Sequence, residues 1–467
     1  MRKKAIIIGG GLGGLATALT LSKQYEVHIF EKNASLGGKM KVIDIDGFHF
    51  DFGPNTLTMP HYFWRVIEPF CSNPKEKLPF RHIPNATHHQ IGAHEVVFTI
   101  DEAEMKAQLR KMDEQSAENY PAFLMEIKRL FRLSEETFLR KTFFKKSDYL
   151  SLQLAGDLLK AHPFQTLHTF LETYFPHPEV QKLFERFATY IGSSPYATPA
   201  TFAMIAYFEL VEGTYYLPGG ATKIAEVFTE LLHQQNVHIH TTEAVEQLAT
   251  DGEKIIGCQT TKGLYFADIF ICNGDYDLFQ PLLGRRVPYH ELSTSGYVEL
   301  IGLKQPVPLH HHNVWFSSNY KQEFTALRKG HYAPEPTVYS CYPYASDTSH
   351  PPALFVLINA PNATASDEQQ SIHVTKALEK WGIPLEDIVL RKKLPPSYIE
   401  QNFSVRNGAI YGQASNSLKS SFMRPANRDK KYSNLYYVGG TVHPGGGSPI
   451  VVKGGYHVAK RILAEIK

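Results

Sequence analysis

The chain has 467 residues, about three times the ~150 residues of an average domain, so two interleaved or consecutive domains are expected. Hydrophobic residues make up 43% and charged residues 20% of the chain, which excludes disordered, collagenous and coiled-coil classes. Lys and Arg number 48 against 46 Asp and Glu, so the net charge of +2 gives no reason to expect a nucleic acid partner.

The cysteines and the hydropathy pattern further limit the classes of protein to which the chain can belong. Cys71, Cys258, Cys272 and Cys341 show neither CxxC spacing nor a cluster, which argues against a zinc site or a disulfide framework and favours a reducing cytoplasm. No stretch approaches the ~20 apolar residues that span a bilayer. We therefore expect any membrane contact to be peripheral.

The first thirty residues carry the strongest local pattern. Ala5 to Ile8 is a short apolar run of the kind found in buried parallel strands, and the run 26–30 resembles it. Between them lies a glycine turn opening a helix, and an acid closes the second strand. This order predicts a dinucleotide site, with a merely tight strand-to-helix turn as the alternative. The expected cofactor contacts are Gly9, Gly11, Leu12, Gly14, Glu31 and Lys32.

Two further turns follow the acid. Gly37-Gly38-Lys39 comes shortly after Glu31, and Asp51-Phe52-Gly53-Pro54-Asn55 lies a short stretch beyond. Each alone is typical of an ordinary β-turn. Their joint spacing behind Glu31 resembles that of FAD-dependent, amine-oxidase-like flavoproteins, and this resemblance implies FAD rather than NAD. We expect Gly38, Lys39, Gly53, Pro54 and Asn55 to contact the FAD.

The middle of the chain returns to the nucleotide domain. Residues 216–220 (YLPGG) precede a predicted helix over 222–233 and a strand over 237–241. Val245 follows, and its backbone is expected to meet the adenine. A further strand over 265–272 ends at Asn273-Gly274-Asp275.

A second glycine-rich turn lies near the end of the chain. Asn434 to Val438 reads as a buried strand, and a helix is expected from about 450 to 466. The N-terminus of that helix would stabilise negative charge on the pyrimidine end of a flavin. The alternative is a glycine-rich loop that only caps a helix. The predicted contacts are Gly439, Gly440, Gly447, Ser448, Pro449 and Ile450.

These motifs resemble the carotenoid desaturase and oxidase family of the phytoene-desaturase type over nearly the whole chain. The matching segments are GGGLGG, Gly38-Lys39, DFGPN, YLPGG, His311-His312-Asn313, residues 408–412 and NLYYVGGTVHPGGGSP. Residues 190–194, 295–298 and 406–412 look most similar to diapocarotenoid terminal oxidases, called 4,4'-diaponeurosporene or diapolycopene oxygenases. One departure is Lys39, where the family commonly carries arginine.

The resemblance implies an α/β fold. It combines a Rossmann-like FAD-binding domain of the amine-oxidase and phytoene-desaturase type with a mixed-sheet substrate domain and a helical, membrane-facing lobe. The expected boundaries are 1–75, 205–285 and 400–467 for the FAD domain, 76–204 for the helical lobe and 286–399 for the substrate sheet.

The helical segment from Phe123 to Phe175 mixes aromatic and basic residues. Such a mixture suits the surface of an anionic bilayer, with Phe143, Phe144, Lys145 and Lys146 as candidate contacts, although a solvated helix face over a core is the alternative. A lipid-soluble substrate favours the membrane. We expect a cytoplasmic protein peripherally bound to the inner face of the cell membrane.

Residues for the chemistry itself are few. His310 to His312 are not expected to bind a metal, because consecutive residues on a strand point to opposite faces. His443 is a candidate for orienting water or the flavin, with a loop-fixing hydrogen bond as the alternative. Tyr216, His312 and, more weakly, Glu212 are pocket candidates. No nucleophile, base and acid set is evident, as expected if the cofactor supplies the chemistry.

The predicted function is FAD-dependent oxidation of an acyclic diapocarotenoid at its terminal methyl group to an aldehyde. Desaturation of such a chain is the alternative enzyme activity. A non-catalytic carrier resembling prenyl-protein escort proteins is the alternative of another class, against which the intact glycine fingerprint and Glu31 argue. The electron acceptor, dioxygen or a quinone, stays open.

Overall fold

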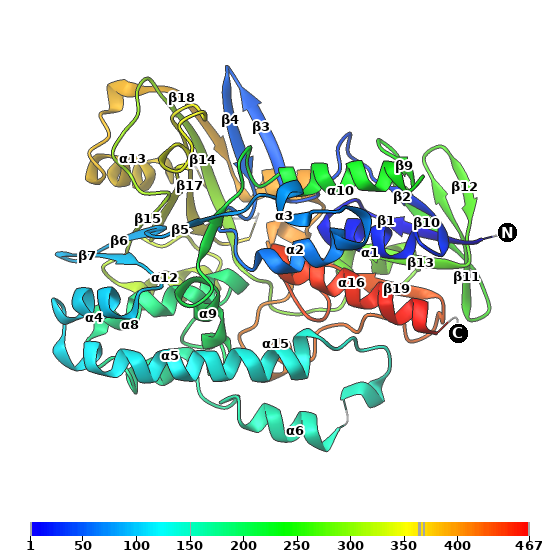
Figure 1. Ribbon diagram of the computed structural model, residues 1–467, viewed down its shortest axis with the longest axis horizontal. Helices are drawn as coiled ribbons and strands as arrows, with labels where there is room; N and C mark the ends of the chain where they lie inside the picture. Colours follow the sequence, from blue (N-terminus) through cyan, green and yellow to red (C-terminus); the bar gives the residue numbers. More distant parts are fainter. Residues whose placement is uncertain (1, 150, 363–365, 368, 466–467) are drawn as a thin grey trace.

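The computed structural model describes residues 2–149, 151–362, 366–367 and 369–465. Figure 1 shows a parallel sheet at the right, a larger mixed sheet at the upper left and a helical lobe along the lower left. The parallel sheet has five strands in the order β19-β13-β1-β2-β9. Their bounds are Lys3–Ile8 (β1), Tyr25–Phe30 (β2), His238–His240 (β9), Ile269–Asn273 (β13) and Leu435–Val438 (β19). Both ends and the middle of the chain therefore build one Rossmann-like sheet, as expected.

Both faces of this sheet are covered, which explains the continuous apolar strands. Ala5 and Ile7 face a helical layer, whereas Ile6 and Ile8 face a small antiparallel meander. The meander consists of β10 (Val245–Asp251), β11 (Lys254–Thr260) and β12 (Gly263–Phe266). The helical layer consists of α1 (Leu12–Leu21), α2 (Pro60–Ile67), α10 (Lys223–Gln234) and α16 (Ser448–Ala464). Helix α16 ends two residues before the predicted end at 466, which lies outside the described residues.

The second sheet has seven strands in the order β18-β14-β17-β16-β15-β6-β7. It is antiparallel except for the parallel pair β15-β6. The bounds are Thr87–Ile91 (β6), His94–Phe98 (β7), Ser295–Leu303 (β14), His312–Trp315 (β15), Val338–Cys341 (β16), Ala353–Ala360 (β17) and Ile388–Leu394 (β18). The predicted helical lobe began at 76, so it wrongly included β6 and β7. These two strands extend the substrate sheet because β6 pairs with β15, a contact more than 200 residues away in sequence.

Two further sheets have two strands each. Strands β3 (Lys41–Ile45) and β4 (Phe48–Phe52) pair with each other, and β5 (Arg81–Ile83) pairs with β8 (Thr214–Tyr216). The first pair ends at the Gly53 turn and the second precedes the YLPGG turn. Asp51 joins the two turns, since its Oδ2 accepts a hydrogen bond of 2.8 Å from the Ala221 amide.

The helical lobe packs around buried aromatic rings such as Phe123, Phe175 and Phe184. Its helices are α4 (Glu102–Arg110), α5 (Glu114–Ser134), α6 (Leu152–Leu159), α7 (Leu167–Glu172), α8 (Pro178–Glu185) and α9 (Ala206–Leu210), with a π-helical turn over Glu135–Leu139 and 3-10 turns over Arg186–Ile191 and Ala200–Ile205. The other helices are α3 (Pro74–Lys77), α11 (Tyr276–Leu282), α12 (Tyr320–Arg328), α13 (Ser371–Lys380), α14 (Pro396–Phe403) and α15 (Leu418–Phe422).

The predicted lipid contacts are wrong at two positions. Phe143 is only 1% and Phe144 only 5% exposed, because Phe143 packs on Tyr149 and Phe144 on Tyr436. Lys145 is exposed. Within the described part of the chain, no helix combines the length and the apolar character needed to cross a membrane.

Candidate functional site

A cavity of about 510 Å³ opens at the carboxyl ends of the parallel strands. This is where doubly wound sheets bind nucleotides, and the volume lies within the ordinary range of ligand sites. Most of the predicted cofactor residues line it. They are Gly9, Gly11, Leu12, Glu31, Lys32, Gly38, Lys39, Gly53, Pro54, Val245, Gly439, Gly440, Gly447 and Ser448.

The first glycine turn is built for close approach. Gly9 has φ +101°, and a Cβ there would lie 2.1 Å from the Asn273 carbonyl oxygen. Gly14 does not line the cavity. A Cβ on Gly14 would lie 2.5 Å from the Gly9 carbonyl oxygen, so this glycine lets the helix pack on the strand. Asn273, which the sequence analysis left as a strand end, donates from Nδ2 to the carbonyl oxygens of Gly9 at 2.9 Å and Gly11 at 3.2 Å.

Two helix N-termini point their free amides at this cavity. Helix α1 begins after Gly11 and α16 after Gly447, and neither residue provides a side-chain cap. The two helices lie side by side. Glycine at position 455 permits this close packing, because a Cβ there would sit 2.2 Å from the Gly13 carbonyl oxygen. Uncapped amide groups at a helix start favour anionic ligands. The pair suits a cofactor with a pyrophosphate and a second electron-rich group, as in FAD.

Glu31 presents a carboxylate at the end of β2. It is 6% exposed, its Oε2 accepts from the Gly10 amide at 2.8 Å and its Oε1 accepts from the Asn33 amide at 2.9 Å. Each carboxylate oxygen accepts more than one hydrogen bond, so both keep capacity for ribose hydroxyls. The carboxylate thus fits the predicted role.

Lys39 places an ammonium group in the lining of this cavity. Its Nζ donates to the Ile410 carbonyl oxygen. Burial lowers the pKa of Lys39 to about 8, against the smaller opposing effect of Asp275. A bound pyrophosphate would supply the anion that this partly desolvated ammonium lacks among its close contacts.

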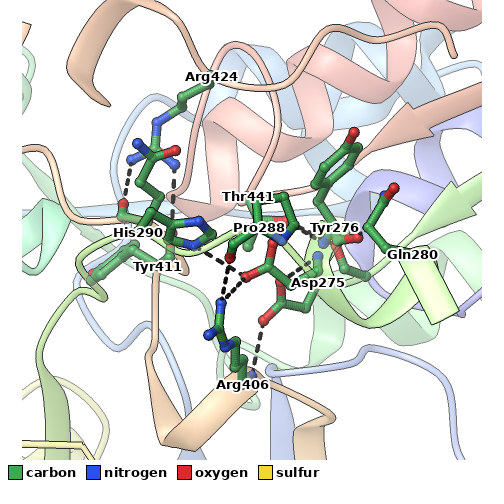
Figure 2. A network of polar contacts seen from close by, with 12 residues as sticks. Asp275, Tyr276, Gln280, Pro288, His290, Arg406, Tyr411, Arg424 and Thr441 are labelled. Atoms are coloured by element: carbon green, nitrogen blue, oxygen red, sulfur yellow. Dashed lines mark hydrogen bonds and ion pairs between the residues drawn. The ribbon is translucent and has the colours of Figure 1, made fainter. Parts of the chain in front are cut away.

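The segment 406–412 is fastened to the nucleotide domain by the network in Figure 2. The Arg406 amide donates to Asp275 Oδ2 at 3.0 Å, and its guanidinium donates to Asp277 Oδ2 at 3.0 Å. The Tyr276 amide donates to Thr441 Oγ1 at 2.8 Å. These bonds tie β13, the segment 406–412 and the C-terminal glycine loop into one rigid wall.

A second cavity of about 300 Å³ adjoins the first. Its lining is largely apolar and comes from the helical lobe and the seven-stranded sheet, with Phe138, Met204, Phe208 and Phe422 among its residues. The predicted contacts Asn55, Pro449 and Ile450 lie here. Residues that line both cavities are Gly53, Pro54, Phe355, Leu357, Ile410, Tyr411, Gly446, Gly447 and Ser448. The two cavities therefore meet beside the glycine loop, where the redox-active ring of a flavin is expected.

His443 does not line either cavity, which corrects its predicted role. It is 5% exposed, and its Nε2 lies 3.0 Å from the carbonyl oxygens of Phe138 and Lys141. Burial lowers its pKa to about 4, so the ring is neutral and donates one hydrogen. The loop-fixing hydrogen bond, the alternative left open by the sequence, is what the structure shows.

Tyr216 and His312 are likewise outside the cavity walls. The Tyr216 hydroxyl donates to Asp347 Oδ2 at 3.0 Å. His312 stands one layer behind the wall, with its Nδ1 2.9 Å from the Tyr339 hydroxyl. Glu212 accepts from the Tyr207 hydroxyl at 2.8 Å. These three residues support neighbouring side chains rather than the reacting atoms.

Two of the three consecutive histidines lie closer together than strand alternation predicts. The potential ligand atoms of His311, His312 and Cys341 lie within 4.8 Å of one another. Strand alternation does not separate the two histidines because β15 begins only at His312, so His311 is free to turn toward its neighbour. The expectation of no metal stays a prediction.

Comparison with known proteins agrees with this geometry. Residues 12–463 match the family described as flavin containing amine oxidoreductase. A 1-hydroxycarotenoid 3,4-desaturase of Flavobacterium sp. is 34% identical over 96% of this chain and 96% of its own. A zeta-carotene-forming phytoene desaturase of Myxococcus xanthus is 28% identical over 99% of this chain and 94% of its own. A 4,4'-diaponeurosporene oxygenase of Staphylococcus haemolyticus is 28% identical over 99% of this chain and 97% of its own.

Solved structures confirm the fold. A variant of putrescine oxidase superposes with a TM-score of 0.65 at 13% identity, covering 99% of both chains. Cyclohexylamine oxidase from Brevibacterium oxydans superposes with a TM-score of 0.63 at 14% identity, covering 100% of both. With the family match over nearly the whole chain and a cavity that fits the dinucleotide, the chain belongs to the flavin-containing amine oxidoreductases and is an FAD-dependent enzyme.

Proposed function

We propose that this enzyme oxidises an acyclic carotenoid, and specifically that it converts the terminal methyl group of a diapocarotenoid to an aldehyde. The observation that carries the proposal is the junction of the two cavities. A long apolar chain in the second cavity would bring one end to the shared wall at Gly53, Tyr411 and Gly447. The oxygenase relatives, which match nearly the full chain, support this choice of substrate.

The chemistry needs little from side chains. Bound FAD accepts a hydride. Loss of a hydride from an allylic methyl would leave a cation spread over the polyene, and water would add to give the alcohol and release a proton. Once the electron acceptor had reoxidised the flavin, loss of a second hydride from the alcohol carbon and of the hydroxyl proton would give the aldehyde. The chain's own residues exclude bulk water, hold the polyene by apolar burial and keep its end at the shared wall.

Desaturation of the same kind of chain is the second candidate. The relative at 34% identity is a desaturase, and that identity exceeds the 28% of the diaponeurosporene oxygenase. Desaturation would use the same hydride transfer, followed by proton loss from the neighbouring carbon instead of addition of water.

Product analysis separates the two. The FAD-loaded protein, in lipid vesicles containing an acyclic diapocarotenoid, is expected to give a product that has gained one oxygen and lost two hydrogens. A product that has only lost hydrogen would assign desaturation. Recovery of only unchanged substrate with every electron acceptor, dioxygen and a quinone included, would refute carotenoid oxidation.

The source of the oxygen tests the proposed order of steps. Under isotopically labelled dioxygen in ordinary water, the first-formed alcohol should carry no label. The reaction must be quenched early because aldehydes exchange their oxygen with water. A labelled alcohol would overturn the hydride-then-water sequence and leave the FAD assignment intact.

We also propose that the protein binds a membrane surface, through residues other than the buried Phe143 and Phe144. We define the α6 surface by three exposed apolar side chains, Leu152 (95% exposed), Leu159 (63%) and Phe164 (79%). Helix α6 lies at the lower edge of the molecule in Figure 1. The Thr137 hydroxyl donates to Asp157 Oδ2 at 3.1 Å, which ties α6 to the π-helical turn whose Phe138 and Leu139 line the substrate cavity. A lipid-soluble substrate would thus pass from the bilayer surface to the cavity over a short distance.

A further inference from the structure

The lining of the substrate cavity is largely apolar by area, but it includes a cluster of charged and phenolic side chains, which we call the polar wall. The 3-10 turn Arg186–Ile191, α9 and α12 bring Arg186, Glu209, Tyr190 and Tyr320 to it. Arg186 is 7%, Glu209 6% and Tyr320 1% exposed, so all three are buried in the fold. A hydrocarbon chain alone gives no reason to place a guanidinium, a carboxylate and two phenols in its binding site.

Internal contacts hold this wall rigidly. Arg186 Nη2 donates to Glu209 Oε2 at 2.6 Å, and Nη1 donates to the Tyr190 hydroxyl at 3.3 Å. The Tyr190 hydroxyl donates to Glu209 Oε1. The guanidinium lies over the Phe187 ring, 4.9 Å from its centre. The charges are therefore paired, and the group is fixed in one orientation.

Two polar groups of the wall have no partner among the residues that the structure describes. They are Arg186 Nε and the Tyr320 hydroxyl. Both belong to residues that line the cavity. Buried polar groups are nearly always hydrogen-bonded, so an unpaired N–H and an unpaired hydroxyl on two residues that line the same cavity indicate a ligand that completes them.

We propose that this wall binds a hydroxyl group at the end of the carotenoid chain. The hydroxyl oxygen would accept from Arg186 Nε and exchange a hydrogen bond with the Tyr320 hydroxyl. This inference rests on the proposed carotenoid substrate and deepens it, since it makes an oxygen-bearing chain end a recognised feature.

The position of the wall fits this role. The Tyr190 hydroxyl lies 3.5 Å from Thr56 Oγ1, and Thr56 directly follows the Gly53–Asn55 turn that borders the cofactor cavity. Burial raises the pKa of Tyr320 well above its usual value, so its hydroxyl stays protonated and keeps a hydrogen to donate. A bound hydroxyl would thus lie near the end of the chain that reacts.

The hydroxyl could come from two sources. It is either a tertiary alcohol already present on the substrate or the primary alcohol formed at the terminal methyl in the first oxidation. Both offer the same donor and acceptor, so the wall recognises the shared chemistry, and the choice of probes separates the sources.

The test measures binding without turnover. The holoenzyme, with its flavin reduced under anaerobic conditions, is titrated in detergent micelles with three acyclic carotenoids: a hydrocarbon, a tertiary alcohol and a primary alcohol of equal chain length. We expect one or both alcohols to bind about tenfold more tightly than the hydrocarbon, the effect of one or two buried hydrogen bonds. The alcohol that is preferred identifies the source.

Two variants assign the effect to this wall. Tyr320→Phe removes one hydroxyl without changing charge and should reduce the alcohol preference about fivefold. Tyr120→Phe is the matched control, because Tyr120 is buried in the same aromatic cluster but does not line the cavity. Equal binding of all three carotenoids, or an unchanged preference in Tyr320→Phe, would overturn the subsite and leave carotenoid oxidation standing. Failure to bind any of the three would overturn both proposals.

Discussion

Lys39 is a buried ammonium whose charge depends on pH in the physiological range. Burial lowers its pKa to about 8 from 10.5. A bound pyrophosphate favours the charged form, so FAD binding below pH 8 meets a lysine already protonated, whereas binding above pH 8 must take up a proton. FAD affinity should therefore fall as pH rises through 8, about tenfold between pH 7 and pH 9 for one proton. Fluorescence titration of the apoprotein with FAD measures this.

Substitution isolates Lys39 from other groups that titrate. Lys39→Arg keeps its charge at pH 9 because a guanidinium does not lose its proton there, so the fall in affinity should disappear. Lys39→Met should bind FAD more weakly at pH 7 and show the same flat profile. An equal loss of affinity with pH in wild type and Lys39→Arg would show that another group is responsible.

Glu31 is expected to contribute to FAD affinity through the hydrogen bonds that its two carboxylate oxygens accept. Glu31→Gln replaces an acceptor pair with one acceptor and one donor, so one of the two backbone amides and the ribose hydroxyls lose a partner. FAD affinity should drop at least about tenfold. Glu246→Gln, an exposed neighbour of Val245, is the matched control. Unchanged affinity in folded Glu31→Gln would contradict the assigned role.

At the scale of elements, the close packing of α1 on α16 holds both uncapped helix starts against one cavity. Gly455→Ala would place a Cβ 2.2 Å from the Gly13 carbonyl oxygen and force the helices apart. We expect a loss of about 1–3 kcal/mol in the free energy of unfolding, together with weaker FAD binding. Chemical denaturation of the apoprotein and the holoenzyme measures both effects.

Gly156 in α6 provides the contrast. A Cβ there meets nothing within 4 Å, so Gly156→Ala should leave stability unchanged or raise it by up to about 1 kcal/mol through helix propensity. Similar losses in the free energy of unfolding in both variants would show that the cost of alanine does not come from the contact between α1 and α16.

For the whole molecule, the α6 surface is expected to set membrane affinity. Changing Leu152, Leu159 and Phe164 to Ser should reduce co-sedimentation with anionic vesicles at least about tenfold, because these side chains would no longer leave water on binding. Phe266→Ser is the control, since Phe266 is 60% exposed on the meander strand β12. Equal binding by all variants would exclude the α6 surface as the anchor.

The local sequence was enough to predict the glycine turns and the acid of the nucleotide site. Glycine turns, apolar strands and the acid Glu31 act over fewer than 40 residues, and each demands a particular backbone at its own position. Val245 and Lys39 also line the cofactor cavity as predicted. The resemblance of the motifs added the fold class, which the family match and the solved structures confirm.

Tertiary structure alone decided the substrate half. Arg186 and Glu209 meet across 23 residues, β6 pairs with β15 across more than 200, and Phe143 turns inward onto Tyr149. His443 contacts the carbonyl groups of residues 138 and 141 and lines neither cavity. Sequence spacing cannot show these outcomes, because a side chain's surroundings depend on which distant segments pack against it. The glycine turns of the cofactor site follow from local sequence. The second cavity, in contrast, forms only where the seven-stranded sheet and the helical lobe pack together.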